Sequence, residues 1–380
     1  MSNSAKQEYL QEIRKRYFLA SKSDKTLILD EFCATCGFNR KYVIRLIRKK
    51  QTTVNRRRGR HKKYYSATLL AFLKDLWVMT NLACSKRLKA AIRLWLPYYH
   101  SKNNNLLSDE DRKLLLEISP RTIDRLLHQL KSKHKKLGLS TTKPGSLLKK
   151  QIPIKLNQWD ESRPGFIEAD TVAHCGSSLS GQFAYTLNIV DIASGWTEQR
   201  ALWGKGQRGV FEALKNINKH LPFKVLGFDC DNGGELLNYM LLEYFTHRKN
   251  PVQYTRSREY KKNDNAHVEE KNWTHVRQFI GYLRFDKSET VALLNDLYLT
   301  EWRFYLNFFI PSFKLIDKKR NGSKIIKIFD PPKTPYQRLI ESPFISKAKK
   351  KELIKIFTSL DPYKLENNMK NKIKNILKLY

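Results

Sequence analysis

The sequence predicts a multidomain protein: all-α helix-turn-helix domains precede an α/β core with a mixed five-stranded sheet, and a mostly helical, basic region follows. Three observations lead to this prediction. The 380 residues are enough for two or three domains. The spacing of apolar residues is helical in the first part of the chain and changes to short strands from Gly165 onward. Lys and Arg, 72 in number, exceed the 36 Asp and Glu, and the excess runs along the whole chain.

The charge of the chain favours a polyanionic partner. The formal net charge is +36 and the sequence pI is about 9.9, which makes nucleic acid the first candidate. A ribosome-associated protein, or a charge that serves only solubility, is the alternative. Hydrophobic residues make up 41% and aromatic residues 12% of the chain, which is enough for packed cores and argues against disorder.

The five cysteines are odd in number and scattered, which indicates a reducing compartment. Cys33 and Cys36 have the spacing of zinc ligands, but a second pair of ligands is not close by in the sequence. The better interpretation is that both cysteines are small apolar residues inside a helical domain. The most apolar stretch, residues 304–310, is too short to span a membrane. We therefore expect a cytoplasmic, nucleoid-associated protein without a membrane partner.

Residues 1–52 are predicted to form a helix-turn-helix domain. A helical stretch ends at a break around Gly37, and the next helix begins with Asn39 as its capping residue. A helix, a glycine-containing turn and a basic amphipathic helix are typical of this motif. The side chains expected to face DNA are Arg40, Lys41 and Arg45. An ordinary helical hairpin with a solvated basic face is the alternative.

Residues 53–64 form a basic arm or linker. A run of like charges with one glycine is not a core element, and arginines beside a glycine suit a narrow minor groove. The arginines concerned are Arg56, Arg57, Arg58 and Arg60. A plain solvated linker is the alternative.

Residues 65–140 are predicted to form a second helical DNA-binding domain. Its last helix opens with Ser119 as the cap and Pro120 at the first helical position. Arg121 and Arg125 would be exposed on that helix and contact DNA, unless it is a plain surface helix. Residues 141–160, which are basic and contain Pro144 and Gly145, follow as a linker.

Residues 161–289 are predicted to form the α/β core. The expected order is three antiparallel strands, a helix, a strand, a helix, a strand and a helix. The predicted strands cover residues 166–172, 181–190, 196–202, 223–229 and 252–255, and the predicted helices cover 207–220, 236–250 and 265–283. Residues 290–380 follow as a basic, mostly helical region that is irregular after Phe309.

Three carboxylates stand out in this basic core. Asp170 lies on an apolar strand, Asp231 at the carboxyl end of a strand, and Glu269 near the start of a helix. Each has an ordinary explanation alone: a satisfied strand residue, a turn residue, and an early-helix acid behind an N-cap at Asp264. Together, on elements that can hold them rigidly, they suit two divalent ions that cleave and join phosphodiesters.

The segment from about Gly165 to Arg284 resembles the integrase-type catalytic core of DDE transposases and retroviral integrases, a ribonuclease-H-like fold. Asp170 matches the first-strand Asp of that family. The sequence from Asp231 to Glu235 matches its Asp-Asn-Gly-x-Glu signature. The sequence from Asp264 to Glu269 is similar to the Asp-Asn-Ala-x-x-Glu pattern of bacterial insertion-sequence transposases, and 37 residues separate Asp231 from Glu269.

The same resemblance selects among neighbouring acids. It favours Asp231 over Asp229 and Glu269 over Glu270, and it places Asn272 where relatives often carry Asn. The chain departs from the family at Glu259, near which many relatives have Pro. It also lacks the His-His-Cys-Cys zinc pattern of retroviral integrases, which favours the bacterial branch.

The resemblance implies a DDE-type transposase that binds Mg²⁺ or Mn²⁺, two ions per site, through Asp170, Asp231 and Glu269. Such an enzyme cleaves strands at transposon ends and transfers the 3′-hydroxyl into target double-stranded DNA, generally as a homo-oligomer. Four basic residues near the acids could position phosphates: Lys261, Lys262, Lys271 and Arg277. A nuclease of the same fold without strand transfer, and a DNA-binding regulator with a retained core, are the alternatives.

Overall fold

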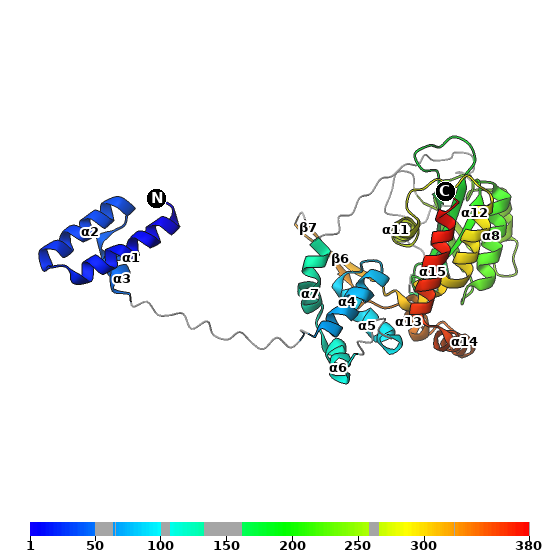
Figure 1. The fold of residues 1–380 in the computed structure, drawn as a ribbon. Coiled ribbons are helices and arrows are strands. Elements are labelled where there is room, and N and C mark those ends of the chain that lie inside the picture. Colours follow the sequence, from blue (N-terminus) through cyan, green and yellow to red (C-terminus); the bar gives the residue numbers. More distant parts are fainter. Residues whose placement is uncertain are drawn as a thin grey trace. The chain divides into compact units, whose positions relative to one another are not determined.

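The computed structural model describes residues 1–49, 64, 66–99, 107–132, 162–257, 266–322 and 324–379. The chain divides into two compact units, Met1–Lys63 and Tyr64–Tyr380, each described here by itself (Figure 1). The predicted arm arginines 56–58 and 60, the linker at 141–160, and Lys261, Lys262 and Asp264 lie outside the described residues. In the described part, no helix is long and apolar enough to cross a membrane.

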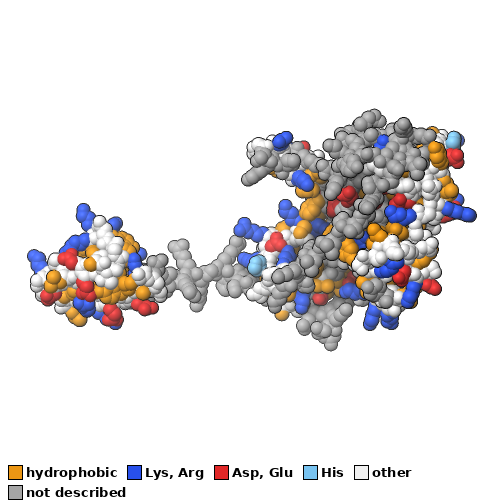
Figure 2. Space-filling view, turned by 90° about the horizontal axis from the view of Figure 1, so that it is seen from above, with side chains coloured by type: hydrophobic (Ala, Val, Ile, Leu, Met, Phe, Trp, Pro, Cys, Tyr) orange, Lys and Arg blue, Asp and Glu red, His pale blue; other side chains and the backbone are white. Residues whose placement is uncertain are grey.

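The first unit consists of helices α1 (Asn3–Leu19), α2 (Lys22–Cys36) and α3 (Arg40–Arg48). Gly37 ends α2 with a left-handed φ of 67°, and the side chain of Asn39 accepts a hydrogen bond from the amide of Lys41 at the start of α3. Val43 and Ile47 on α3 pack into a small core that includes both cysteines of the unit. Lys and Arg side chains project from the visible face of this unit (Figure 2). The order of helix, glycine turn and basic helix is as predicted, and its DNA-binding role stays a prediction.

The second unit begins with four helices, α4 (Ala67–Met79), α5 (Ser85–Trp95), α6 (Asp109–Glu117) and α7 (Pro120–Ser132). The indole of Trp95 donates a hydrogen bond to the carbonyl of Phe309 at 3.0 Å, and Nε of Arg87 donates to the carbonyl of Pro311 at 2.6 Å. The buried apolar side chains of these four helices belong to the same hydrophobic core as those of the sheet and the C-terminal helices. These helices therefore pack within the second unit rather than forming a unit of their own.

The sheet has five strands in the order β3-β2-β1-β4-β5. They are β1 (Phe166–Ala173), β2 (Ala184–Asp191), β3 (Thr197–Trp203), β4 (Gly227–Cys230) and β5 (Gln253–Arg256). The first three are antiparallel, and β1, β4 and β5 run parallel. The predicted mixed sheet and its order of elements are confirmed, although β4 starts at Gly227 and is shorter than expected.

Helices cover both faces of the sheet. Helices α8 (Gln207–His220) and α9 (Tyr239–Thr246) place Leu214 and Phe245 beside Ile167 of β1. Successive side chains of a strand point to opposite faces, so Glu168 and Asp170 point to the other face, where helix α10 (Ala266–Lys271) lies. This alternation places the acidic residues of β1 under one helix.

The predicted helix at residues 265–283 is not uniform. α10 gives way to a π-helical segment, Asn272–Arg277, and then to α11 (Gln278–Ile280), which ends at Gly281 with a φ of 80°. A π-helical turn contains an extra residue, so it changes which side chains face the sheet. Asn272, at the first position of this segment, contacts the sheet through its side chain.

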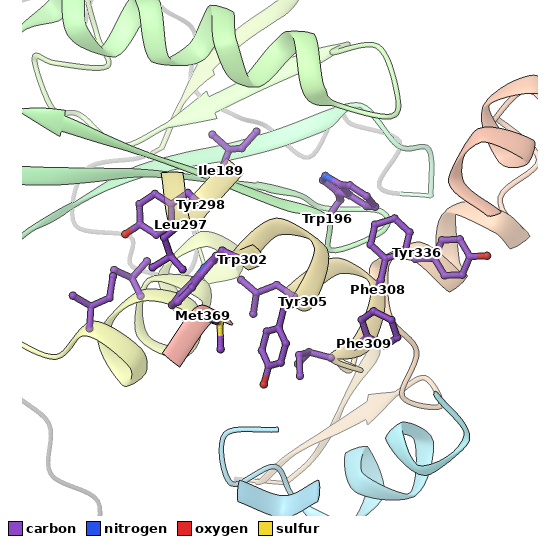
Figure 3. Close-up of a cluster of buried hydrophobic side chains, with 14 of the residues drawn as sticks. Ile189, Trp196, Leu297, Tyr298, Trp302, Tyr305, Phe308, Phe309, Tyr336 and Met369 are labelled. Atoms are coloured by element: carbon purple, nitrogen blue, oxygen red, sulfur yellow. The ribbon is translucent and has the colours of Figure 1, made fainter. Parts of the chain in front are cut away.

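The C-terminal region supports the sheet. Helix α12 (Glu289–Leu297) runs into π-helical segments Tyr298–Trp302 and Tyr305–Phe309, whose aromatic side chains form a buried cluster (Figure 3). Phe308 lies between Trp196, the residue before β3, and Tyr336, with ring centroids 5.6 and 4.9 Å away. The cluster also takes Met369 from the last helix, so this helix packs into the core. The closing helices are α13 (Pro335–Glu341), α14 (Lys347–Ser359) and α15 (Pro362–Leu377).

The prediction of an irregular stretch after Phe309 is wrong. Strands β6 (Leu315–Asn321) and β7 (Lys324–Phe329) form an antiparallel hairpin, with Gly322 at a φ of 60° in the turn. The sequence of β7, Lys-Ile-Ile-Lys-Ile-Phe, is rich in β-branched residues, but its two lysines belong to the basic run and interrupt the apolar pattern.

Candidate active site

Asp170 and Asp231 lie side by side where the parallel pairing of β1 and β4 ends. Ala169 of β1 is opposite Cys230, the last residue of β4, so the next residue along each chain segment is one of the two acids. Ligand sites of open α/β sheets lie at the carboxyl ends of such strands. The structure therefore brings together two acids that are 61 positions apart in the sequence.

The pKa of Asp170 reflects its burial and the neighbouring acids. Burial, followed by the negative charge of Asp231 and a smaller contribution from Glu269, raises the pKa of Asp170 to about 7. The amide of Thr171 and the side chain of Asn272 oppose this rise by donating hydrogen bonds of 2.7 and 2.6 Å to the carboxylate. The contribution of Glu269 places its charge in the same site.

The Asp-Asn-Gly-Gly-Glu turn has a physical reason for each of its first three residues. Oδ1 of Asp231 accepts a hydrogen bond from the amide of Gly233 at 3.0 Å. A Cβ at Gly233 would lie 2.9 Å from that same oxygen and from the carboxylate of Glu235, so a larger residue would push these two acidic side chains out of place. Asn232 is buried and donates to the carbonyl of Ser257 at 3.2 Å, which ties the turn to the end of β5.

A cation that the sequence analysis missed lies beside this turn. Nζ of Lys205 is 3.2 Å from a carboxylate oxygen of Glu235, and Thr171 donates to the same oxygen at 3.1 Å. Burial raises the pKa of Asp231, as does Glu235, while the Gly233 amide and Lys205 act against the rise. Lys205 lies 26 residues from Asp231 in a loop, so no local sequence pattern marks it.

Glu269 is positioned by its helix. The fully buried carboxylate of Glu168 on β1 accepts hydrogen bonds from the amides of His267 and Val268 at 3.1 and 3.2 Å. A carboxylate at a helix N-terminus satisfies free amides and complements the helix dipole. The sequence analysis gave Glu168 no role, although it lies two residues before Asp170 on the same face of the strand. Glu269 itself is exposed.

A chain of hydrogen-bonded side-chain amides ends on the carboxylate of Asp170. Gln199 of β3 donates to Asn188 of β2 at 2.8 Å, Asn188 donates to Asn272 at 2.8 Å, and Asn272 donates to Oδ2 of Asp170 at 2.6 Å. Gln199 and Asn188 are fully buried. A carboxylate can only accept, and this fixes the orientation of each amide in turn. The chain therefore holds the Asp170 side chain as an acceptor.

The described residues contain no group of three His, Cys, Asp or Glu side chains arranged to hold a metal ion. The arrangement is an acidic pair, Asp170 and Asp231, with Glu269 nearby on the exposed side of its helix.

The predicted DNA-contacting residues fall into two groups. Lys41 and Arg45 of α3 and Arg121 and Arg125 of α7 are exposed, and so is Arg40, which pairs with Asp30. Lys271 and Arg277 are less exposed. Lys271 is buried and lines a cavity. Arg277 is half-buried, donates to the carbonyl of Ala173 at 2.7 Å and lies over the ring of Tyr282.

Two solved structures resemble parts of the chain. One is the intasome of simian T-cell lymphotropic virus in complex with PP2A regulatory subunit B56 gamma, with 13% identity, a TM-score of 0.32, and coverage of 58% of this chain and 66%, just under two thirds, of that chain. The other is the catalytic core domain of BIV integrase, with 17% identity, a TM-score of 0.29, and coverage of 47% and 95%. No family model matches the sequence.

A curated protein matches far more closely. The Uncharacterized protein y4rM of Sinorhizobium fredii (strain NBRC 101917 / NGR234) is 35% identical over 344 residues, which cover 89% of this chain and 96% of that protein. Because the likeness extends over nearly the whole length of both proteins, the chain belongs to the same family as y4rM.

Proposed function

We propose that the protein is a DDE-type DNA transposase that cleaves strands at transposon ends and joins the 3′-hydroxyl to target DNA. One observation supports this most strongly. Asp170 and Asp231 lie side by side where the parallel pairing of β1 and β4 ends, and the charge of Glu269 contributes to the raised pKa of Asp170. These are the three acids that the motifs selected, and they come from three separate elements.

The donor set suits a hard divalent cation. All three candidate ligands, Asp170, Asp231 and Glu269, offer carboxylate oxygens, which Mg²⁺ and Mn²⁺ prefer. The raised pKa values of the two aspartates reflect burial and, for Asp170, repulsion from Asp231, and a bound cation would offset that repulsion. When bound, two such ions would activate the attacking oxygen and stabilise the leaving oxygen of a phosphodiester.

The protein's own residues prepare this chemistry. The amide of Asn272 holds one oxygen of Asp170, and the amide of Gly233 holds one oxygen of Asp231. Glu168 holds the helix that carries Glu269. Because Glu168 lies on a strand and Asn272 on a helical segment, these two supports position the acids before the substrate arrives.

DNA binding is assigned to the basic helices. Arg40, Lys41 and Arg45 on α3 and Arg121 and Arg125 on α7 are exposed and cationic, so they can contact phosphates or bases of the transposon end. Arg56, Arg57, Arg58, Arg60, Lys261 and Lys262 are proposed as further contacts from the sequence alone. We propose that two or more copies act together on paired ends.

The test is a joining assay with Mg²⁺. Its substrate is a duplex that carries the terminal inverted repeats from the DNA flanking the gene. A transposase produces strand-transfer products that disappear when EDTA is added. A nuclease of the same fold produces cleavage without joining and little preference for the repeat. A DNA-binding regulator binds the repeat with or without chelator and produces neither, and that result would refute the proposal.

A further inference from the structure

A cavity of 330 Å³ lies behind the helix that carries Glu269. Its walls are α10, the turn between β2 and β3, and the base of the β6–β7 hairpin. The charged side chains that reach it from these walls include Lys271 and Glu270 of α10, Lys314 and Lys327 of the hairpin, and Arg338 of α13.

Lys271 is the unusual member of this set. Its side chain is 7% exposed, and among the described residues no hydrogen bond or ion pair within 4.0 Å connects it to a partner. A buried ammonium without a partner is costly, so it favours any anion that can enter.

The other charges around the cavity are mostly engaged. Arg338 pairs with Asp330 at 2.9 Å, and Lys314 donates to the carbonyl of Ala193 at 3.3 Å. Asp191 accepts hydrogen bonds from the amides of Gly165 and Ser194 at 2.7 and 2.8 Å. Glu270 is exposed, as is Lys327. His267, also on the wall, adds a further ring that can donate or accept.

We propose that this cavity binds a phosphate group, with Lys271 as its principal donor and Lys327 at its mouth. A divalent cation would be repelled there, and an apolar ligand would leave the ammonium without a partner. A phosphate brings both charge and acceptor oxygens, and it can come from a DNA strand or from a free nucleotide. The inference does not depend on Asp170, Asp231 or Glu269 being catalytic.

The experiment measures binding in EDTA with two probes, inorganic pyrophosphate by calorimetry and a short duplex of unrelated sequence by fluorescence anisotropy. Lys271→Met keeps the length of the side chain and removes its charge, and we expect it to weaken binding by about tenfold. Glu270→Gln removes the opposing carboxylate and should strengthen binding by about threefold. Lys351→Met, an exposed lysine on α14, is the matched control and should leave both affinities unchanged.

The two probes distinguish the sources of the phosphate. If the variants change only the affinity for pyrophosphate, the ligand is of the nucleotide type. If they change only the affinity for the duplex, the phosphate belongs to a DNA backbone. If Lys271→Met does not fold, the opposite shift expected of Glu270→Gln still tests the proposal. It is overturned if Glu270→Gln leaves both affinities unchanged, or if Lys271→Met does so while raising the unfolding temperature, as a purely structural buried lysine would.

Discussion

The side chain of Asp170 is held in place by hydrogen bonds to both of its carboxylate oxygens. Its two oxygens accept hydrogen bonds from the Thr171 amide and from Asn272, while burial and Asp231 raise its pKa to about 7. Two donors therefore hold the carboxylate in place against the repulsion of its neighbour. This is the kind of support that orients a metal ligand.

Asn272→Ala removes the donor closest to Asp170 and interrupts the amide chain. We expect strand-transfer activity to fall between about tenfold and about hundredfold, with the Mg²⁺ concentration for half-maximal activity raised. End binding, measured by anisotropy, should stay unchanged. Asn368→Ala, on the exposed side of α15, is the control. Wild-type Mg²⁺ dependence in Asn272→Ala would show that the chain does not position Asp170.

A buried histidine makes stability dependent on pH. Burial, and then the charge of Arg277, lowers the pKa of His174 from 6.5 to about 3. The unfolded chain takes up a proton as pH falls through 6.5, and the folded chain does not, so the free energy of unfolding decreases between pH 7 and pH 3. Between pH 7 and pH 5 the loss should be about 2 kcal/mol.

His174→Phe should abolish this component of the acid sensitivity. All seven tryptophans lie in the second unit, so urea unfolding followed by tryptophan fluorescence reports that unit alone. The comparison of variant and wild type at pH 7 and pH 5 also removes the opposite effect of Asp191, whose pKa burial raises to about 6. An equal loss of stability in both proteins on acidification would contradict the assignment.

Helix α10 depends on tertiary contacts for its stability. It has only six residues, which are too few for a helix to be stable by intrinsic propensity. Glu168 supplies one by accepting from two of its first amides, and Asn272 supplies another at its far end. The position of Glu269 therefore depends on Glu168 and Asn272. Both lie outside the two sequence patterns at residues 231–235 and 264–269, and they are far apart in the sequence.

Glu168→Ala leaves those amides without their acceptor. A lost cap of this kind costs about 1–2 kcal/mol, and the cost should appear locally. Hydrogen exchange at residues 266–271 should become faster, with a parallel loss of joining activity. Glu168→Gln keeps one acceptor oxygen and should be intermediate. Unchanged exchange in Glu168→Ala would show that the helix is held by other contacts.

The mixed sheet and the order of its strands and helices along the chain could be predicted from the sequence, as could the local settings of Asp170 and Asp231, because strand periodicity and the Asp-Asn-Gly turn are local patterns. The order of the strands within the sheet could not. Lys205, Glu168 and Gln199 could not, since each reaches the site through contacts between distant segments. The β6–β7 hairpin was missed because lysines interrupt its isoleucines. The burial of Lys271 depends on the packing of α10 against the hairpin, which no local pattern records.

In the proposed function, the two units have different main roles. The first unit carries the exposed basic helix α3, and the second carries the acids and the basic helix α7. A net charge of +36 favours binding to any DNA, so a preference for one DNA sequence must come from particular side chains. We expect that preference to come first from α3.

Replacing Lys41 and Arg45 with Ala should weaken binding to the terminal repeat and lower the slope of log affinity against log salt by about two. The tryptophan-reported stability of the second unit should not change. The matched control replaces Lys15 and Lys22, two exposed lysines of the same unit, with Ala. Equal losses in both double variants would mean that α3 contributes charge only.

Joining assays on Asp231→Asn and Glu269→Gln decide whether the three acids form one metal-dependent site. Both changes keep the size of the side chain and remove one ligand charge. We expect each variant to bind the terminal repeat normally and to form no strand-transfer product with Mg²⁺, while Glu212→Gln, at an exposed acid on α8, joins DNA like the wild type. Wild-type joining by either Asp231→Asn or Glu269→Gln would show that the three acids do not form such a site.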